Sequence, residues 1–244
     1  MVFMKNIVEI KHFRMDFGNK TVIKDLSFEV HAGEIFGLLG SNGSGKTTTL
    51  RALLGFYTPT SGELLIDGKP YNPEDNTITV GYLPEERGLY RKEKVIDNLV
   101  YFGELKGLKN PREWAIKYLK RVKLDTKMDE KLEKLSGGQQ QKVQLGVTIM
   151  NQPKLLILDE PTKGFDPMNR RLLMEIIEEL HQKGTAVIMI THYMDEVEKL
   201  CDRAILLKDG VAHAYGTISE IKKQHNGKSL EQIFVDVYGG DDEQ

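Results

Sequence analysis

The chain has 244 residues, 40% of them hydrophobic, which is enough to bury one complete α/β core. Its 34 Lys and Arg nearly balance 36 Asp and Glu, which excludes non-specific recruitment by an overall electric field, and no nucleic-acid partner is expected. A single cysteine excludes an internal disulfide framework, and no apolar run approaches the roughly 18 residues that cross a bilayer. We therefore expect a cytoplasmic protein that depends on another chain for any membrane-spanning part.

The first third of the chain predicts β-strands joined by tight turns. Apolar and alternating residues, bounded by glycine and asparagine, indicate strands at 7–17, 22–30 and 34–39. A further strand at 63–66 ends in the turn Asp67-Gly68. The third of these strands leads directly into a glycine-rich segment.

The middle of the chain changes to helical spacing. Between residues 95 and 122, apolar side chains recur at the intervals of helix faces. This stretch is the candidate for a helical lobe inserted into the α/β core.

The last third alternates between strand and helix. Strands are predicted at 155–158, 185–190 and 204–207, and helices at about 170–183 and at 194–200. Such alternation implies right-handed crossovers and a mainly parallel sheet. The final residues, 239–244, are polar and acidic and are expected to fray.

The glycine-rich segment, residues 40–47, has the spacing of a phosphate-binding loop. Three glycines let its backbone N–H groups converge on a phosphate, and Lys46 and the Thr47 hydroxyl stand where they can reach the β- and γ-phosphates and Mg²⁺. An ordinary glycine turn would leave that lysine and hydroxyl unexplained. The predicted ATP-binding residues are Gly40, Ser41, Asn42, Gly43, Ser44, Gly45, Lys46, Thr47 and Thr48. Lys46 is also expected to stabilise charge during hydrolysis.

A second motif ends the strand at 155–158. Its four apolar residues are followed by Asp159 and Glu160, at the strand end that opens on the ligand crevice of a parallel sheet. Asp159 is expected to hold Mg²⁺, mostly through water, and Glu160 to orient or deprotonate the attacking water. The alternative is a solvated strand end without chemistry, which the presence of a phosphate loop in the same chain disfavours.

A third motif is Leu135-Ser136-Gly137-Gly138-Gln139, here called the signature segment, which precedes a helix expected to begin near Gln140. In company with the two motifs above, it resembles the ATP-binding cassette (ABC) ATPase family over nearly the whole chain. The alternative is a glycine turn that caps a helix. The resemblance implies that Ser136, Gly137, Gly138 and Gln139 bind the γ-phosphate held by an opposing subunit. The implied partner is a second ABC ATPase subunit, identical or different, arranged head-to-tail around two ATPs.

Other family positions follow from the resemblance. His192, directly after a predicted strand, matches the histidine that contacts the γ-phosphate and the attacking water. Residues 161–166 match the D-loop, with Phe165 where leucine is more usual and Asp166 expected at the dimer interface. Phe17 matches the aromatic residue that stacks on adenine, although a strand-packing role for Phe17, or Phe13 in its place, stays open.

One position departs from the family. Glu85 stands where the family generally has the glutamine of the Q-loop, so a metal ligand at Glu85 would bring extra negative charge close to the triphosphate. The stretch 83–90 and the segment 230–234 are similar to those of bacterial subunits that drive sodium or drug efflux with a separate ABC-2-type membrane subunit. Export is therefore the suggested direction.

Together these features predict an α/β fold of the P-loop NTPase type: a RecA-like, mainly parallel core sheet with an antiparallel β subdomain and an inserted helical subdomain. We expect residues 1–83 and 154–222 to form the ATP-binding core, 84–153 the helical subdomain, and 223–244 a C-terminal tail. The resemblance implies an ATPase that drives an integral membrane permease from the inner face of the cell membrane. The alternatives are an ABC-type ATPase without a role in transport and an ATP-sensing regulatory module.

Overall fold

The computed structural model describes residues 5–74, 78–86 and 88–239. Three strands at its centre are buried along their whole length: β3 (Ile35–Leu39), β6 (Leu155–Asp159) and β7 (Ala186–Ile190). Their unbroken apolar sequences are typical of parallel strands covered on both faces. β7 pairs in parallel with both neighbours. The residues that follow the three strands therefore meet at one edge of the sheet.

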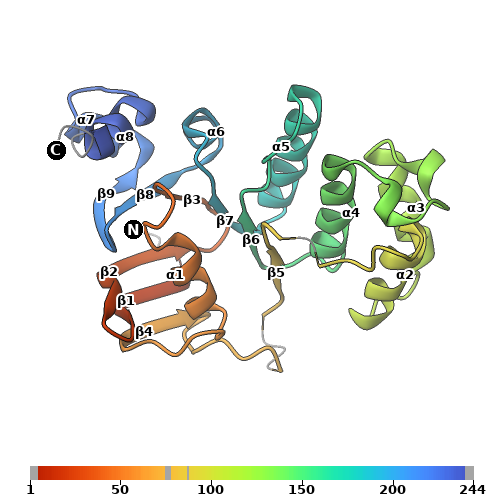
Figure 1. The fold of residues 1–244 in the computed structure, drawn as a ribbon, viewed down its shortest axis with the longest axis horizontal. Helices are drawn as coiled ribbons and strands as arrows, with labels where there is room; N and C mark the ends of the chain where they lie inside the picture. Colours follow the sequence, from red (N-terminus) through yellow and green to blue (C-terminus); the bar gives the residue numbers. More distant parts are fainter. Residues whose placement is uncertain (1–4, 75–77, 87, 240–244) are drawn as a thin grey trace.

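Six further strands complete the sheet, whose order is β4-β1-β2-β9-β8-β3-β7-β6-β5 (Figure 1). On one side of the central strands lies β5 (Val80–Leu83), and on the other lie β8 (Arg203–Lys208) and β9 (Val211–Thr217). The outer strands β1 (Asn6–Phe17), β2 (Lys20–His31) and β4 (Ser61–Ile66) pair antiparallel. The predicted fold class is confirmed: a mainly parallel core joined to an antiparallel part.

The helices differ from prediction mainly at their first residues. The helix after the signature segment, α4 (Gly137–Ile149), begins three residues before Gln140, because Ser136 and Gln139 form a capping box. α5 (Pro167–Gln182) begins before residue 170, because Asp166 accepts a hydrogen bond from the Asn169 N–H at 2.9 Å and Pro167 suits the first turn. The predicted helical lobe contains α2 (Val95–Leu105), α3 (Pro111–Arg121) and two short 3₁₀ turns, η1 (Asp125–Lys127) and η2 (Leu132–Lys134).

The central strands divide the apolar interior into two cores. Leu155 and Ile157 face the core shared with β1, β2 and α1 (Lys46–Leu53). Leu156 and Leu158 face the core shared with α5 and with the helices α2, α3 and α4. Figure 1 shows α2, α3 and α4 gathered at one end of the molecule. The stretch proposed as a helical subdomain is therefore attached to the sheet through one shared core.

The stretch expected to be a C-terminal tail contains ordered structure. After α6 (Met194–Leu200) and α7 (Ile218–Gln224), the chain forms α8 (Leu230–Tyr238), in which Leu230 and Ile233 are buried. Of the residues expected to fray, 240–244 lie outside the described residues. Across the described ranges, no helix combines the length and apolar character that crossing a membrane requires.

The packing of α3 on α4 gives a first prediction. An added Cβ at Gly146 would lie 2.4 Å from Tyr118 Cε1, next to the ring whose hydroxyl donates to the Lys142 carbonyl at 2.7 Å. We expect Gly146→Ala to lower the free energy of unfolding by about 1–3 kcal/mol, because overpacking outweighs the helix preference of alanine. Chemical denaturation measures this change. Gly88→Ala, where the added carbon meets open space, is the control, and a more stable Gly146→Ala protein would contradict the prediction.

Candidate active site

The phosphate loop, residues 40–47, connects β3 to α1 and can be formed only with glycine at fixed positions. Gly40, Gly43 and Gly45 have φ angles of 153°, 83° and 108°. A Cβ on Gly40 would lie 2.5 Å from the Leu207 carbonyl oxygen, and one on Gly45 would lie 2.3 Å from Ile23 Cδ1. The dihedral angles favour glycine at all three positions, and the lack of space also requires it at Gly40 and Gly45. The loop consequently curls tightly against the sheet and presents the N-terminus of α1 to an anion.

Lys46 is the buried cation of this loop. Its ammonium group donates to the carbonyl oxygens of Gly40 and Ser41, each at 2.8 Å. Burial lowers the pKa of Lys46, and the nearby carboxylates of Glu160, Asp159 and Glu85 oppose that shift. The loop carbonyls hold the ammonium group where phosphate oxygens could replace them.

Among the predicted site residues, five with ionisable side chains, from four different segments, line one cavity of about 240 Å³: Lys46, Glu85, Asp159, Glu160 and His192. The buried Asp159 has its pKa raised to about 6, first by burial and then by the charges of Glu85 and Glu160. The carboxylates therefore give the cavity surplus negative charge, and the Thr47 hydroxyl lies in the same cavity.

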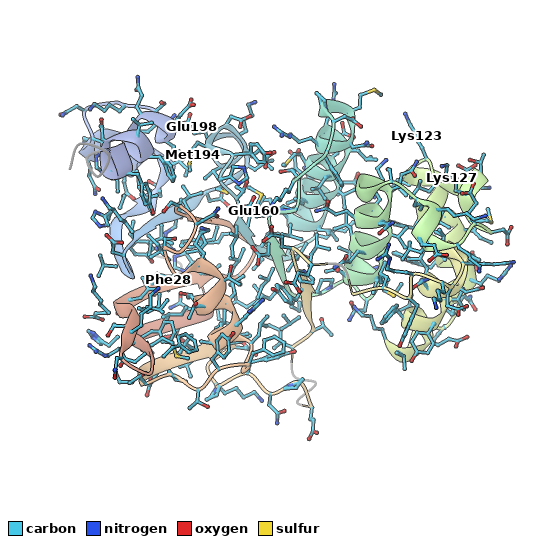
Figure 2. All side chains as sticks on the ribbon, viewed as in Figure 1. Phe28, Lys123, Lys127, Glu160, Met194 and Glu198 are labelled. Atoms are coloured by element: carbon cyan, nitrogen blue, oxygen red, sulfur yellow. The ribbon has the colours of Figure 1, made fainter. Side chains whose placement is uncertain are left out.

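Glu160 and His192 lie next to each other in this cavity. Strand register places them side by side, since Asp159 pairs with Ile190 and the Glu160 N–H donates to the Ile190 carbonyl at 2.9 Å. The His192 Nδ1 atom lies 2.9 Å from Glu160 Oε2. Glu160 has a φ of 49°, an uncommon conformation for a residue other than glycine. Figure 2 shows Glu160 near the centre of the molecule, between the sheet and the helices α4 and α5.

Glu85 has a partner that the sequence analysis did not identify. Its Oε1 atom lies 2.5 Å from Lys163 Nζ in the D-loop, and both side chains are about half exposed. The hydrogen bond to Glu85 raises the pKa of Lys163. The lysine also lines the cavity that contains Asp159 and Glu160. The acid that departs from the family pattern is therefore paired with a base in a neighbouring loop.

A second unforeseen group connects the D-loop to the segment that carries His192. Glu196 is buried and accepts a hydrogen bond from the Thr162 hydroxyl at 3.0 Å. Arg170 lies 3.2 Å from the same carboxylate and 4.2 Å from the centre of the Tyr193 ring. Burial raises the pKa of Glu196 to about 6. This cluster joins the start of α5 to the start of α6, next to His192.

The signature segment lies apart from the phosphate loop. None of its described residues lines the three cavities that contain residues of the loop. It packs instead on the D-loop: a Cβ on Gly138 would lie 3.3 Å from Phe165, and the Gln141 side chain donates to the Pro161 carbonyl at 2.8 Å. Within one chain, Ser136 to Gln139 and Gly40 to Thr47 do not form a single site.

The two adenine-stacking candidates differ in exposure. Phe13 is fully buried, whereas Phe17 is 43% exposed and meets Tyr57 edge-on, with ring centres 5.3 Å apart. A cavity of about 520 Å³ contains Lys20 and Val22 beside residues of the phosphate loop, including Gly45. Thr48 also lines it. An exposed ring at the end of β1 is available for stacking, and a buried one is not.

Comparisons with known proteins point to one family. A family model described as ABC transporter matches residues 23–163. The chain is similar to an ABC transporter ATP-binding protein of Methanocaldococcus jannaschii, with 46% identity over 89% of this chain and 80% of that protein. It is also similar to Nod factor export ATP-binding protein I of a Rhizobium species, with 35% identity over 94% of this chain and 77% of the relative. A solved ATP-binding subunit of an ABC transporter superposes with a TM-score of 0.86 at 29% identity, over 94% of this chain and 98% of that one.

The pair between Glu85 and Lys163 gives a second prediction. Lys163→Ala should lower the ATP hydrolysis rate about twofold to fivefold, because Glu85 then adds uncompensated charge beside Asp159. In a Glu85→Gln background the same lysine substitution should have little further effect, and Glu85→Gln itself should preserve nucleotide binding. Steady-state hydrolysis rates of the four proteins measure the coupling.

Lys199→Ala, which removes an exposed lysine paired with Asp195 on α6, is the matched control. Equal effects of Lys163→Ala in both backgrounds would show that the lysine acts independently of Glu85.

Proposed function

This chain belongs to the ABC transporter family and is one of its ATP-binding subunits with ATPase activity, and from this premise we propose that it drives export through a separate membrane permease. The direction is supported by the relative named for Nod factor export, at 35% identity. We place the protein on the cytoplasmic face of the membrane, because ATP is supplied there and the permease would provide the membrane-spanning part.

We propose that two ATPase subunits close head-to-tail around two ATPs. The observation that carries this proposal is the separation within one chain of the signature segment from the cavity of Lys46, Glu160 and His192. The exposed N-terminus of α4, with Ser136 as its cap, is a natural partner for an anion, and in the dimer that anion is the γ-phosphate on the other subunit. ATP then favours the closed pair because only the closed pair contacts the γ-phosphate.

Magnesium fits the oxygen ligands of this cavity. The Thr47 hydroxyl and the carboxylates of Asp159 and Glu85 are hard donors of the kind that Mg²⁺ prefers. The pKa of Asp159 is raised first by burial and then by neighbouring carboxylate charges, and a cation would offset those charges. The ion would neutralise charge on the phosphates during hydrolysis. Lys46 supplies further positive charge from the phosphate loop.

Glu160 is the proposed acceptor of the proton from the attacking water. Its carboxylate faces the same cavity as Lys46, and its Oε1 atom is hydrogen-bonded to His192 Nδ1 at 3.0 Å. This hydrogen bond fixes the direction of the carboxylate, and the strained φ of Glu160 keeps its side chain at the edge of the sheet. The histidine is proposed to contact the γ-phosphate as well.

A surface on the helical part is the proposed permease contact. Tyr90 and Tyr101 are exposed aromatic residues with ring centres 5.5 Å apart, and they line a cavity of about 420 Å³ with Glu93 and Asp97. The buried Asn98 holds Tyr90 in place through both backbone groups of that residue, at 2.9 and 3.1 Å. Because Tyr90 follows Glu85 closely in the chain, this surface can connect a permease to the nucleotide site.

Glu160→Gln tests the assignment of the catalytic carboxylate and the dimer together. We expect turnover to fall roughly 100-fold or more, because an amide cannot accept the proton. ATP binding should remain, and dimers should accumulate with ATP and Mg²⁺, as measured by light scattering after size exclusion. Glu178→Gln makes the same change at an exposed position on α5 and is the control.

Adding Ser136→Ala to Glu160→Gln should reduce the ATP-dependent dimer while ATP still binds. Wild-type turnover in Glu160→Gln would contradict the catalytic role. Dimer formation that does not depend on Ser136 would contradict the proposed arrangement of the two half-sites.

The permease contact has its own test. Tyr101→Ala should leave the ATPase rate of the isolated chain unchanged and reduce the fraction of protein that sediments with native membranes from the source cells. Val235→Ala, which truncates another exposed apolar side chain, on α8, should sediment like the wild type. Full sedimentation of Tyr101→Ala would place the permease contact elsewhere.

A further inference from the structure

We propose that Tyr238, in the C-terminal helix α8, is a positioning residue of the nucleotide site. Its hydroxyl accepts a hydrogen bond from the Ser41 N–H of the phosphate loop at 2.9 Å and donates one to the Leu207 carbonyl at the end of β8. In the sequence, Ser41 is 197 positions and Leu207 is 31 positions from Tyr238. The hydroxyl thereby connects α8 to the start of the phosphate loop. α8 itself lies outside the segment matched by the family model.

The hydrogen bond acts on the peptide group that also contacts the catalytic lysine. The Gly40 carbonyl and the Ser41 N–H belong to one peptide plane. The carbonyl accepts from Lys46 Nζ at 2.8 Å, and the N–H donates to Tyr238. Both polar groups of this peptide are therefore occupied. Since Gly40 has almost no steric restriction of its own, the two hydrogen bonds fix an orientation that the glycine leaves free.

The space around this peptide supports the same role. The Leu207 oxygen that accepts from Tyr238 is the atom that a Cβ on Gly40 would approach to 2.5 Å. The loop, the end of β8 and the tyrosine hydroxyl thus converge at one point. A phenylalanine at 238 would keep the ring and remove both hydrogen bonds, leaving the Ser41 N–H without this partner.

Contacts at both ends hold α8 firmly enough to serve as a support. At its start, Glu198 accepts from the Leu230 N–H at 2.6 Å and pairs with Lys222 at 2.6 Å. Figure 2 shows Glu198 beside the C-terminal helices. At its end, Lys208 donates to the Val237 carbonyl at 2.8 Å. A helix of nine residues is marginal alone, so these contacts and its buried apolar side chains keep it formed.

The consequence is preorganisation of the phosphate loop. Because the Gly40–Ser41 peptide is already ordered before the nucleotide arrives, less conformational entropy is lost when the nucleotide binds. Tyr238 does not need to touch the nucleotide for this effect. The inference rests on nucleotide binding by the loop, as in the proposed function, but it is independent of transport and of the dimer.

Titration of the isolated chain with a fluorescent ADP analogue tests the inference, because ADP lacks the γ-phosphate that drives subunit closure. We expect Tyr238→Phe to raise the dissociation constant roughly threefold to tenfold, the effect of losing hydrogen bonds of ordinary net strength. Amide hydrogen exchange of ¹⁵N-serine-labelled protein should show faster exchange at Ser41 in the variant. If Tyr238 had a purely structural role, the variant would have a lower melting temperature, and exchange at Ser41 would change no more than exchange at the neighbouring amides.

Two controls accompany the variant. Tyr215→Phe removes a phenol hydroxyl that accepts from the Glu29 N–H, by the opposite end of β3, and Val235→Ala truncates an exposed residue of α8. Neither should change the dissociation constant. An unchanged dissociation constant in Tyr238→Phe would overturn the inference, as would unchanged exchange at Ser41. Failure of the wild type to bind ADP would instead contradict the proposed function.

Discussion

Parallel pairing of three buried strands is the constraint on which the rest of the site depends. β3 and β6 lie on either side of β7, and all three run in the same direction. Their carboxyl ends must therefore lie together, although β3 ends more than a hundred positions before β6 and β7 do in the chain. This pairing brings the phosphate loop, Glu160 and His192 to one cavity. A slip of one residue between β6 and β7 would separate Glu160 from His192 and turn the strands' side chains toward the opposite cores.

The fold and the contiguous motifs could be predicted because their information is local. Residues 40–47 contain every feature that a phosphate loop needs, and the unbroken apolar sequence before Asp159 predicts a buried strand. Strand β9 was missed because its sequence, Val211 to Thr217, is short, mixed in polarity and interrupted by Gly216. The early start of α4 was also readable in principle, since Ser136 followed three positions later by Gln139 is the pattern of a capping box.

The supporting residues of the site could not be predicted because their partners are distant in sequence. Lys163 meets Glu85 across 78 positions, and Tyr238 meets Ser41 across 197. Nothing in the local pattern around Tyr238 distinguishes it from other aromatic residues on amphipathic helices. The sequence holds one weak indication of the role of Lys163, which is a basic residue three positions after Glu160 in a chain with an unexpected acid at Glu85. That indication becomes interpretable only when the topology places the two loops together.

The arrangement of the site depends on the balance of its charges as much as on its shape. Three carboxylates, Asp159, Glu160 and Glu85, share a cavity with Lys46, and Lys163 offsets the most exposed of them from outside the sheet. In the proposed function, the remaining positive charge comes from Mg²⁺, from the helix N-terminus of α1 and from the signature segment of the second subunit. Within one chain, Ser136 does not line the cavity that contains Glu160. The proposed dimer would bring the Ser136 of a second subunit to this cavity, so that the motifs of one chain would contribute to two composite sites.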